Sequence, residues 1–197
     1  MKELCEIKEI SQIKSEAKEN QVPIIMDEGL GFILDYIKKN DVRFILEIGT
    51  AVAYSAIQFA KVSPDIRIFT IEYDILRYHE AVKNVVNCGL SHQITVFLGD
   101  ALKFDFTEQF DLIFIDAAKL RNKFFLDKYS KNLNVGGTII VDNMLLDDLW
   151  QGADQKKKAK YDLANQEFKN YILTLQEYEV SIYDDIGDGI AVLRKNK

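Results

Sequence analysis

The chain has 197 residues, of which 48% are hydrophobic and only two are proline. This length and composition fit one domain over residues 1–197 with a sizeable core, and they require no second domain. The formal net charge of −6 excludes a protein that wraps nucleic acid over its whole surface, although a local basic patch stays compatible with it. No run of ~20 uninterrupted apolar residues predicts a membrane segment. Two cysteines without a Cys-x-x-Cys pattern point to a reducing compartment, and we expect a cytoplasmic protein.

Residues 1–40 are expected to form a helical N-terminal cap, with helices over residues 10–20 and 27–39. One face of the first helix carries an apolar stripe made of Ile10, Ile13 and Ala17. We interpret this stripe as packing onto the chain's own sheet. The alternative is a homodimer contact that also caps the functional site.

The core, residues 41–197, alternates apolar runs with helical patterns, which is typical of repeated βαβ units. Strands of a parallel sheet are expected over residues 43–48, 66–72, 93–98, 111–116 and 137–142. Helices are expected over residues 54–61, 75–88, 122–132 and 155–176. The last two strands, residues 180–185 and 190–194, are joined by a short turn in which Asp188 is most simply a turn former, although its position on the rim could let it reach the pocket. The predicted fold is α/β and Rossmann-like: a mostly parallel seven-stranded sheet with an antiparallel C-terminal hairpin and helices on both faces.

Two of the expected strands end in acidic residues, Asp116 and Asp142, and Asn143 follows the second. Ligands of parallel sheets bind beyond the carboxyl ends of the strands, so these side chains share one rim. Two carboxylates and an amide oxygen suit Mg²⁺, Mn²⁺ or Ca²⁺ better than zinc. Each residue alone could be a helix cap or a turn former, but the three together favour a metal site. Lys119, three residues past Asp116, is a possible proton acceptor there.

The turn after the first expected strand, residues 47–55, is built from small residues and lets a ligand approach its backbone. It is not the G-x-G-x-x-G dinucleotide motif, because Gly49 is its only glycine. The second strand ends in Glu72, and an acidic residue there can accept both hydroxyls of a ribose. Asp100 and Ala101 follow the third strand, where an adenine would be held.

Taken together, these segments resemble the metal-dependent O-methyltransferases of the class I S-adenosylmethionine-dependent fold, the family of catechol and caffeoyl-coenzyme A O-methyltransferases. Small bacterial members of that family look most similar. The resemblance spans residues 22–194. It rests on the motifs at residues 47–55, 70–72, 99–101, 114–119 and 142–143. The last two motifs distinguish the metal-dependent group from other methyltransferases.

The resemblance implies S-adenosyl-L-methionine as cofactor, together with Mg²⁺ or another divalent cation. It implies that the cofactor is bound by Glu47, Gly49, Tyr54, Ser55, Glu72, Asp100, Ala101 and Asp116. Within that set, Glu47 and Gly49 would line the methionine part, Glu72 would hold the ribose, and Asp100 and Ala101 would flank the adenine. The implied metal ligands are Asp116, Asp142 and Asn143. Lys119 would be the catalytic base.

Two acceptors are compatible with the resemblance. Bacterial relatives look like enzymes that methylate 5-hydroxyuridine at the wobble position of the tRNA anticodon loop, and catechol-like phenols are the alternative. The preference for tRNA rests on a local concentration of basic residues: Lys119, Arg121, Lys123, Lys128, Lys156, Lys157, Lys158 and Lys160. The overall negative charge favours a small phenol instead.

A cofactor-binding protein without catalytic activity is a third reading. The family usually has glycine before Tyr54-Ser55, where this chain has Ala53. An added methyl group there could crowd the cofactor.

Overall fold

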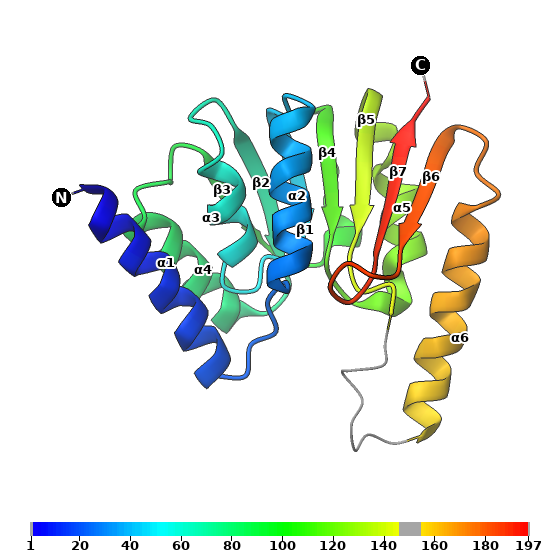
Figure 1. Cartoon of the computed structure of the whole chain (residues 1–197), viewed down its shortest axis with the longest axis horizontal. Helices are drawn as coiled ribbons and strands as arrows, with labels where there is room; N and C mark the ends of the chain where they lie inside the picture. The colour runs from blue at the N-terminus through cyan, green and yellow to red at the C-terminus, as the bar shows by residue number, and fades with distance from the viewer. Residues whose placement is uncertain (1, 146–154, 197) are drawn as a thin grey trace.

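The computed structural model describes residues 2–145 and 155–196, and Figure 1 shows their arrangement around one central sheet. The seven strands run in the order β3-β2-β1-β4-β5-β7-β6. Their bounds are β1 Phe44–Ile48, β2 Arg67–Glu72, β3 Ile94–Leu98, β4 Phe110–Ile115, β5 Leu133–Val141, β6 Tyr178–Tyr183 and β7 Ile190–Lys195. β1 to β5 pair in parallel, whereas β7 is antiparallel to both β5 and β6. The predicted sheet, including its antiparallel hairpin, is confirmed.

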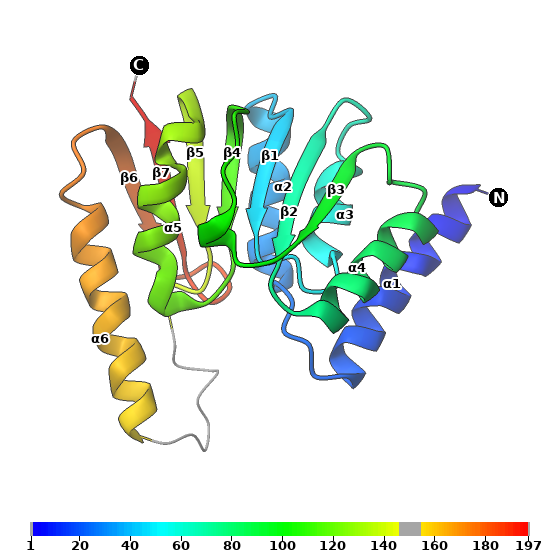
Figure 2. The same ribbon diagram turned by 180° about the vertical axis from the view of Figure 1, so that it is seen from behind.

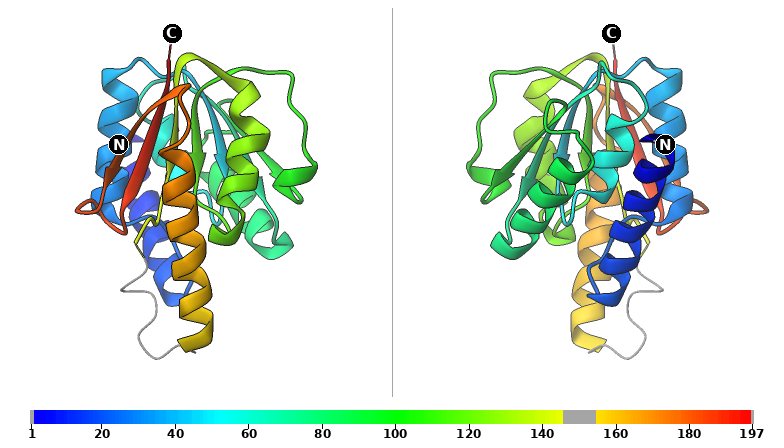
Figure 3. Two further views of the ribbon diagram at one scale, coloured as in Figure 1. Left: turned by 90° about the vertical axis from the view of Figure 1, so that its right-hand side faces the viewer. Right: turned by 90° about the vertical axis from the view of Figure 1, so that its left-hand side faces the viewer.

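Helices cover both faces of this sheet. Their bounds are α1 Lys2–Glu19, α2 Asp27–Lys39, α3 Tyr54–Ala60, α4 Ile75–Asn87, α5 Asn122–Tyr129 and α6 Gln155–Ile172. The described residues also form three short 3₁₀ turns: η1 Ala101–Lys103, η2 Lys119–Arg121 and η3 Ser130–Asn132. Buried side chains of α1 to α4 form one core cluster with one face of the sheet, and those of α5 and α6 form a second cluster with the other. Figures 2 and 3 show α2 and α5 on opposite sides of the strands.

The central strands are apolar on both faces because both faces are covered. In β1, Ile45 belongs to the first core cluster and its neighbour Leu46 to the second, and both are fully buried. β4 alternates in the same way, with Leu112 and Ile113 in different clusters. Two-sided burial is the reason that these parallel strands read as continuous apolar runs in the sequence.

The N-terminal helix packs onto its own chain, as expected. Ile13 and Ala17 are buried in the first core cluster and Ile10 is partly buried against it. α1 begins at Lys2, well before the expected residue 10, and it contacts α3. The homodimer contact stays a prediction. Among the described residues, no helix combines the length and apolar character needed to cross a membrane.

Some element boundaries differ from those expected. β5 begins at Leu133 instead of residue 137, because the strand continues through a glycine pair in which Gly136 has a φ of 76°. The pairing register of β4 and β5 shifts at this point, between Phe110 and Leu112. The helix expected over residues 122–132 ends at Tyr129 and closes in η3. Asp116 and Asp142 lie immediately after their strands rather than inside them.

Candidate active site

A cavity of about 1050 Å³ opens at the carboxyl ends of the parallel strands. Nine of the eleven residues predicted to bind the cofactor or the metal, or to act as the catalytic base, line this cavity. The predicted residues on its wall are Gly49, Tyr54, Ser55, Glu72, Asp100, Ala101, Asp116, Lys119 and Asn143. Two predicted residues, Glu47 and Asp142, are buried and do not line it. Residues 23–26, which join α1 to α2, line one side of the cavity.

Gly49 allows the turn after β1 to cross the end of β4. Its φ is 101°, and a Cβ atom at this position would lie 2.0 Å from the backbone oxygen of Asp116. The amide of Asp116 in turn donates to the carbonyl of Ile48 at 3.0 Å. Any side chain at residue 49 would therefore separate the cofactor turn from the strand end that carries the predicted metal ligand.

Ala53, the departure from the family pattern, occupies the left-handed region with a φ of 65° at the N-cap of α3. Its methyl group is fully buried in the first core cluster, and the residue does not line the cavity. An L-residue in this conformation costs about 1 kcal/mol relative to glycine. Ala53 therefore strains the backbone slightly but does not crowd the cavity. It gives no reason to expect a cofactor-binding protein without catalytic activity.

Glu47 lies beneath the cofactor turn instead of on the cavity wall. Its carboxylate accepts hydrogen bonds from Ser55 Oγ at 2.6 Å and from Thr70 Oγ1 at 2.5 Å. Thr70 is also hydrogen-bonded to Thr50 at 2.6 Å. Burial raises the pKa of Glu47 to about 7, against the two hydroxyl donors, which lower it. This network links β2 to the turn after β1. Two of its members, Thr50 and Ser55, line the cavity.

Glu72 holds the same turn from the end of β2. One carboxylate oxygen accepts the amide of Ala51 at 2.7 Å and the other accepts the amide of Asp74 at 2.8 Å. Each carboxylate oxygen can accept more than one hydrogen bond. Glu72 therefore keeps acceptor capacity for a ligand that carries two adjacent hydroxyls.

Asp100 caps η1 beyond the end of β3. Its Oδ1 accepts the amide of Leu102 at 3.0 Å, and its Oδ2 forms an ion pair with Arg121 at 3.2 Å. The Leu102 amide and the Arg121 guanidinium lower the pKa of Asp100 despite its partial burial. Asp100 is thus a charged, well-held side chain on the cavity wall.

The ends of β4 and β5 bring the two predicted carboxylates together. Ile115 pairs with Val141, and the amide of Asp142 donates to the carbonyl of Ile115 at 3.0 Å. Burial, together with the charges of other carboxylates, raises the pKa of Asp116 to about 7 and that of Asp142 to about 8. Two carboxylates forced into one buried place disfavour each other's ionised form.

Asn143 turns the chain into the cavity directly after Asp142. Its φ of 59° is left-handed, a conformation that asparagine tolerates better than most residues. Asn143 lines the cavity, as Asp116 does. Among the residues that the structure describes, no group of three or more His, Cys, Asp or Glu is arranged to hold a metal ion. A cation here would therefore need the amide oxygen of Asn143 beside the two carboxylates.

Lys119 begins η2 and points its amine into this acidic region. The Nζ atom is buried and has no hydrogen-bond partner among the described residues. Burial lowers the pKa of Lys119, while the charges of Asp188, Asp116 and Asp142 raise it in part. A desolvated amine with a lowered pKa can exist in the neutral form that accepts a proton.

Asp188, interpreted from the sequence as a turn former that could also reach the pocket, is a functional candidate. It lies in the β6–β7 turn and lines the cavity. Its backbone oxygen accepts the amide of Leu145 at 2.6 Å, which ties the hairpin turn to the chain after β5. The only sequence signal is its place between Gly187 and Gly189, and that pattern indicates a turn regardless of function.

The first turns of α6 reach the rim of the cavity. α6 packs against η2, and Tyr161 lines the cavity. Three lysines precede or adjoin Tyr161 on exposed or half-buried positions, Lys156, Lys158 and Lys160. The side chain of Lys157 lies outside the described residues. The two basic segments expected to share a rim therefore lie next to each other.

The chain is similar to known methyltransferases over nearly its whole length. A family model described as O-methyltransferase matches residues 2–196. A catechol O-methyltransferase from Niastella koreensis is 36% identical over 111 residues, which cover 52% of this chain and 50% of that protein. The solved structure of a candidate caffeoyl-CoA O-methyltransferase from Staphylococcus aureus is 31% identical, with a TM-score of 0.87 over 95% of this chain and 92% of that chain.

A further solved structure is the O-methyltransferase TomG from Streptomyces achromogenes in complex with S-adenosylmethionine. It is 22% identical with a TM-score of 0.80, over 96% of this chain and 90% of that chain, and so shows the shared fold. Together with the cavity at the strand ends, these findings identify the chain as a member of the O-methyltransferase family, dependent on S-adenosylmethionine. The family resemblance and the fold class expected from the sequence are confirmed.

Proposed function

We propose that this enzyme methylates a hydroxyl oxygen of an acceptor that carries a second oxygen beside it, with a divalent cation in the site. The observation that carries the proposal is the buried, unpartnered amine of Lys119 beside the strand-end carboxylates. A surface lysine would keep its amine in water, because burying an amine without a hydrogen bond is costly. The burial of this one is explained if it serves a reaction in the cavity.

The donor set at the ends of β4 and β5 fits a hard divalent cation. Asp116, Asp142 and Asn143 offer three oxygen ligands, and the two buried carboxylates need a counter-charge. A cation held there would supply positive charge that favours the deprotonated form of the acceptor hydroxyl. Mg²⁺ is the cation that we propose, with Mn²⁺ or Ca²⁺ as alternatives.

The chain's own residues then have separate tasks. Lys119 Nζ accepts the proton of the acceptor hydroxyl, and the carboxylate of Asp188 stabilises the ammonium that results. Glu72 accepts the ribose hydroxyls with the capacity left by its two backbone donors. The turn at Gly49 admits the methionine part of the cofactor, and Asp100 and Ala101 flank the adenine. These tasks orient the hydroxyl toward the methyl group, as an in-line displacement requires.

The first candidate acceptor is wobble 5-hydroxyuridine in a tRNA anticodon loop. Lys156, Lys158 and Lys160 lie on the helix whose Tyr161 lines the cavity, so phosphates beside the reacting base would meet positive charge. A loop base is already unpaired, which lowers the cost of bringing it into a cavity. The cavity volume of about 1050 Å³ leaves room for a base beside a cofactor.

A catechol-like phenol is the second candidate. The similarity to a catechol O-methyltransferase favours it, as do the acidic residues of the wall. A catechol presents the same pair of adjacent oxygens as 5-hydroxyuridine with its neighbouring carbonyl. Both candidates therefore use the same chemistry at Lys119. They differ in that tRNA also brings phosphates to the rim of the cavity, whereas a phenol does not.

The test is transfer of labelled methyl groups to tRNA lacking wobble methoxylation and, in parallel, to a panel of catechols. We expect labelled tRNA, loss of activity in EDTA and its return with Mg²⁺. Labelling of catechols alone would overturn the tRNA assignment. Full activity in EDTA would contradict the proposed requirement for a divalent cation.

A matched variant separates the two acceptors. Replacing Lys156, Lys158 and Lys160 together by glutamine should raise the KM for tRNA about tenfold through lost phosphate contacts. The same variant should methylate catechols within about twofold of the unmodified enzyme, because these lysines lie on the rim. An unchanged KM for tRNA in this variant would contradict the proposed contact between these lysines and the tRNA phosphates.

A further inference from the structure

The loop between β3 and β4, residues 99–109, forms one wall of the cavity without the support of a strand. Its first residues, Gly99, Asp100 and Ala101, line the cavity, and η1 is its only regular turn. Because the sheet order places β3 beyond β2 and β1, this wall lies past Glu72 along the row of strand ends. Side chains from elsewhere must hold such a loop in place.

Tyr129, at the end of α5, contacts this loop on the side that faces away from the cavity. Its hydroxyl donates to the carbonyl of Ala101 at 2.5 Å and lies 3.4 Å from the carbonyl of Phe104. The side chain is 1% exposed, and Tyr129 is not among the residues that line the cavity. Burial raises the pKa of its hydroxyl, which therefore stays protonated and able to donate. Tyr129 contacts the wall without contacting the cavity.

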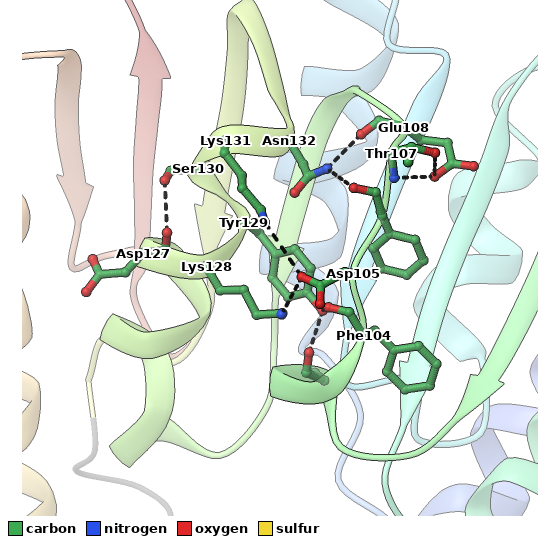
Figure 4. Close-up of polar contacts among 12 residues, drawn as sticks. Phe104, Asp105, Thr107, Glu108, Asp127, Lys128, Tyr129, Ser130, Lys131 and Asn132 are labelled. Atoms are coloured by element: carbon green, nitrogen blue, oxygen red, sulfur yellow. Dashed lines mark hydrogen bonds and ion pairs between the residues drawn. The ribbon is translucent and has the colours of Figure 1, made fainter.

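The rest of the loop is held by the same segment of chain, as Figure 4 shows. Asn132 Nδ2 donates to the carbonyls of Phe106 and Glu108, each at 2.9 Å. Lys128 and Lys131 both pair with Asp105, at 2.9 Å and 3.6 Å. These contacts fall four or more residues beyond Ala101, away from the cavity, so they hold the outer part of the loop. The side-chain hydrogen bond to Ala101 comes from Tyr129.

We propose that Tyr129 is a positioning residue for the cofactor: its hydroxyl fixes the carbonyl of Ala101 and thereby the wall of Asp100 and Ala101 that receives the adenine. The inference rests on the proposed placement of the adenine at this wall. Arg121, just before α5, holds the Asp100 side chain at 3.2 Å. Arg121 and Tyr129, at the two ends of α5, therefore hold adjacent residues of the wall. Arg121 holds the side chain of Asp100, and Tyr129 holds the backbone of Ala101.

The experiment compares Tyr129→Phe with the unmodified enzyme by calorimetric titration at 25 °C. The ligands are S-adenosylhomocysteine and its inosine analogue, which lacks the adenine amino group. We expect about tenfold weaker binding of S-adenosylhomocysteine, since the carbonyl of Ala101 loses its short hydrogen bond and keeps only the 3.4 Å bond from the amide of Phe104. The inosine analogue should weaken less than threefold, because it makes fewer contacts with the wall. Turnover at saturating S-adenosylmethionine should be unchanged.

Lys131→Met is the matched control, because Lys131 contacts the same loop from the same segment but only at Asp105. It should bind both ligands within twofold of the unmodified enzyme. Binding of S-adenosylhomocysteine by Tyr129→Phe within twofold, or equal weakening of both ligands, would overturn the inference. Failure of the unmodified enzyme to bind S-adenosylhomocysteine would instead overturn the cofactor placement.

If Tyr129→Phe does not fold, hydrogen exchange of the unmodified enzyme gives a second test. S-adenosylhomocysteine should slow amide exchange in residues 99–104 and also in residues 128–132, which do not line the cavity. Protection of the loop with no change at residues 128–132 would contradict a positioning role for Tyr129.

Discussion

The two halves of the cavity differ in how their polar groups are satisfied. In the cofactor half, Glu47, Glu72 and Asp100 each accept at least two hydrogen bonds or ion pairs from the chain itself. In the catalytic half, burial raises the pKa of Asp116 and of Asp142, the charge of Asp116 raises that of Asp142 further, and Lys119 Nζ has no hydrogen-bond partner among the described residues.

This difference separates a preformed half from one that needs a ligand. The hydrogen bonds of the cofactor half hold its turns in place before any cofactor binds, which lowers the ordering cost of binding. The catalytic half gathers like charges and a buried amine at a cost in stability. Local conflicts of this kind are expected at functional sites. The predictions below test whether the two halves respond differently to mutation.

The largest expected effect is that of Lys119→Met on turnover. Loss of a general base lowers kcat by 10²-fold to 10⁴-fold, so we expect a fall of about 10³-fold, with S-adenosylhomocysteine affinity within about twofold. Activity of purified variants and calorimetric titration measure the two quantities. Lys83→Met, an exposed lysine paired with Glu80 on α4, is the control and should keep full activity. A parallel loss of turnover and cofactor binding would contradict the division between the halves.

Asp142→Asn should lower activity and raise stability at once. Removing the buried carboxylate of Asp142 relieves its repulsion with Asp116, so the free energy of unfolding without added metal should rise by about 1 to 2 kcal/mol. Addition of Mg²⁺ should then stabilise the unmodified protein but not the variant. Urea unfolding with and without Mg²⁺ at pH 8 measures both effects. A variant less stable than the unmodified protein in metal-free buffer would show that the carboxylates are not in conflict.

The third expected effect concerns Glu47 and the pH dependence of stability, with no change in activity invoked. Its pKa is about 7 in the folded protein against 4.5 as the ordinary value, so the folded state holds this proton more tightly than the unfolded chain. The resulting stabilisation is fully present below pH 4.5 and is lost as pH rises through 7, a change of about 3 kcal/mol. Glu47→Gln stays neutral and should flatten this part of the pH profile. Urea unfolding between pH 4.5 and 8 measures it, and parallel profiles would contradict the assigned pKa.

Most of the sheet could be predicted because its local signals agree. The runs around Ile45, Ile68 and Ile113 are apolar on both faces, and the short turn at Gly187 and Gly189 leaves only an antiparallel hairpin. The start of β5 could not be predicted, since Gly136 and Gly137 usually end a strand, and only pairing with β4 carries the strand through them.

The sequence alone determined the fold family and most of the residues around the cavity, because strand-end residues of a parallel sheet share one rim whatever surrounds them. Only the tertiary structure decided how they act. It buried Glu47 beneath the turn, directed the methyl group of Ala53 into the core, brought Asp188 beside Lys119, and placed Tyr129 behind Ala101. Burial and long-range hydrogen bonds depend on residues distant in the chain, and no local pattern records them.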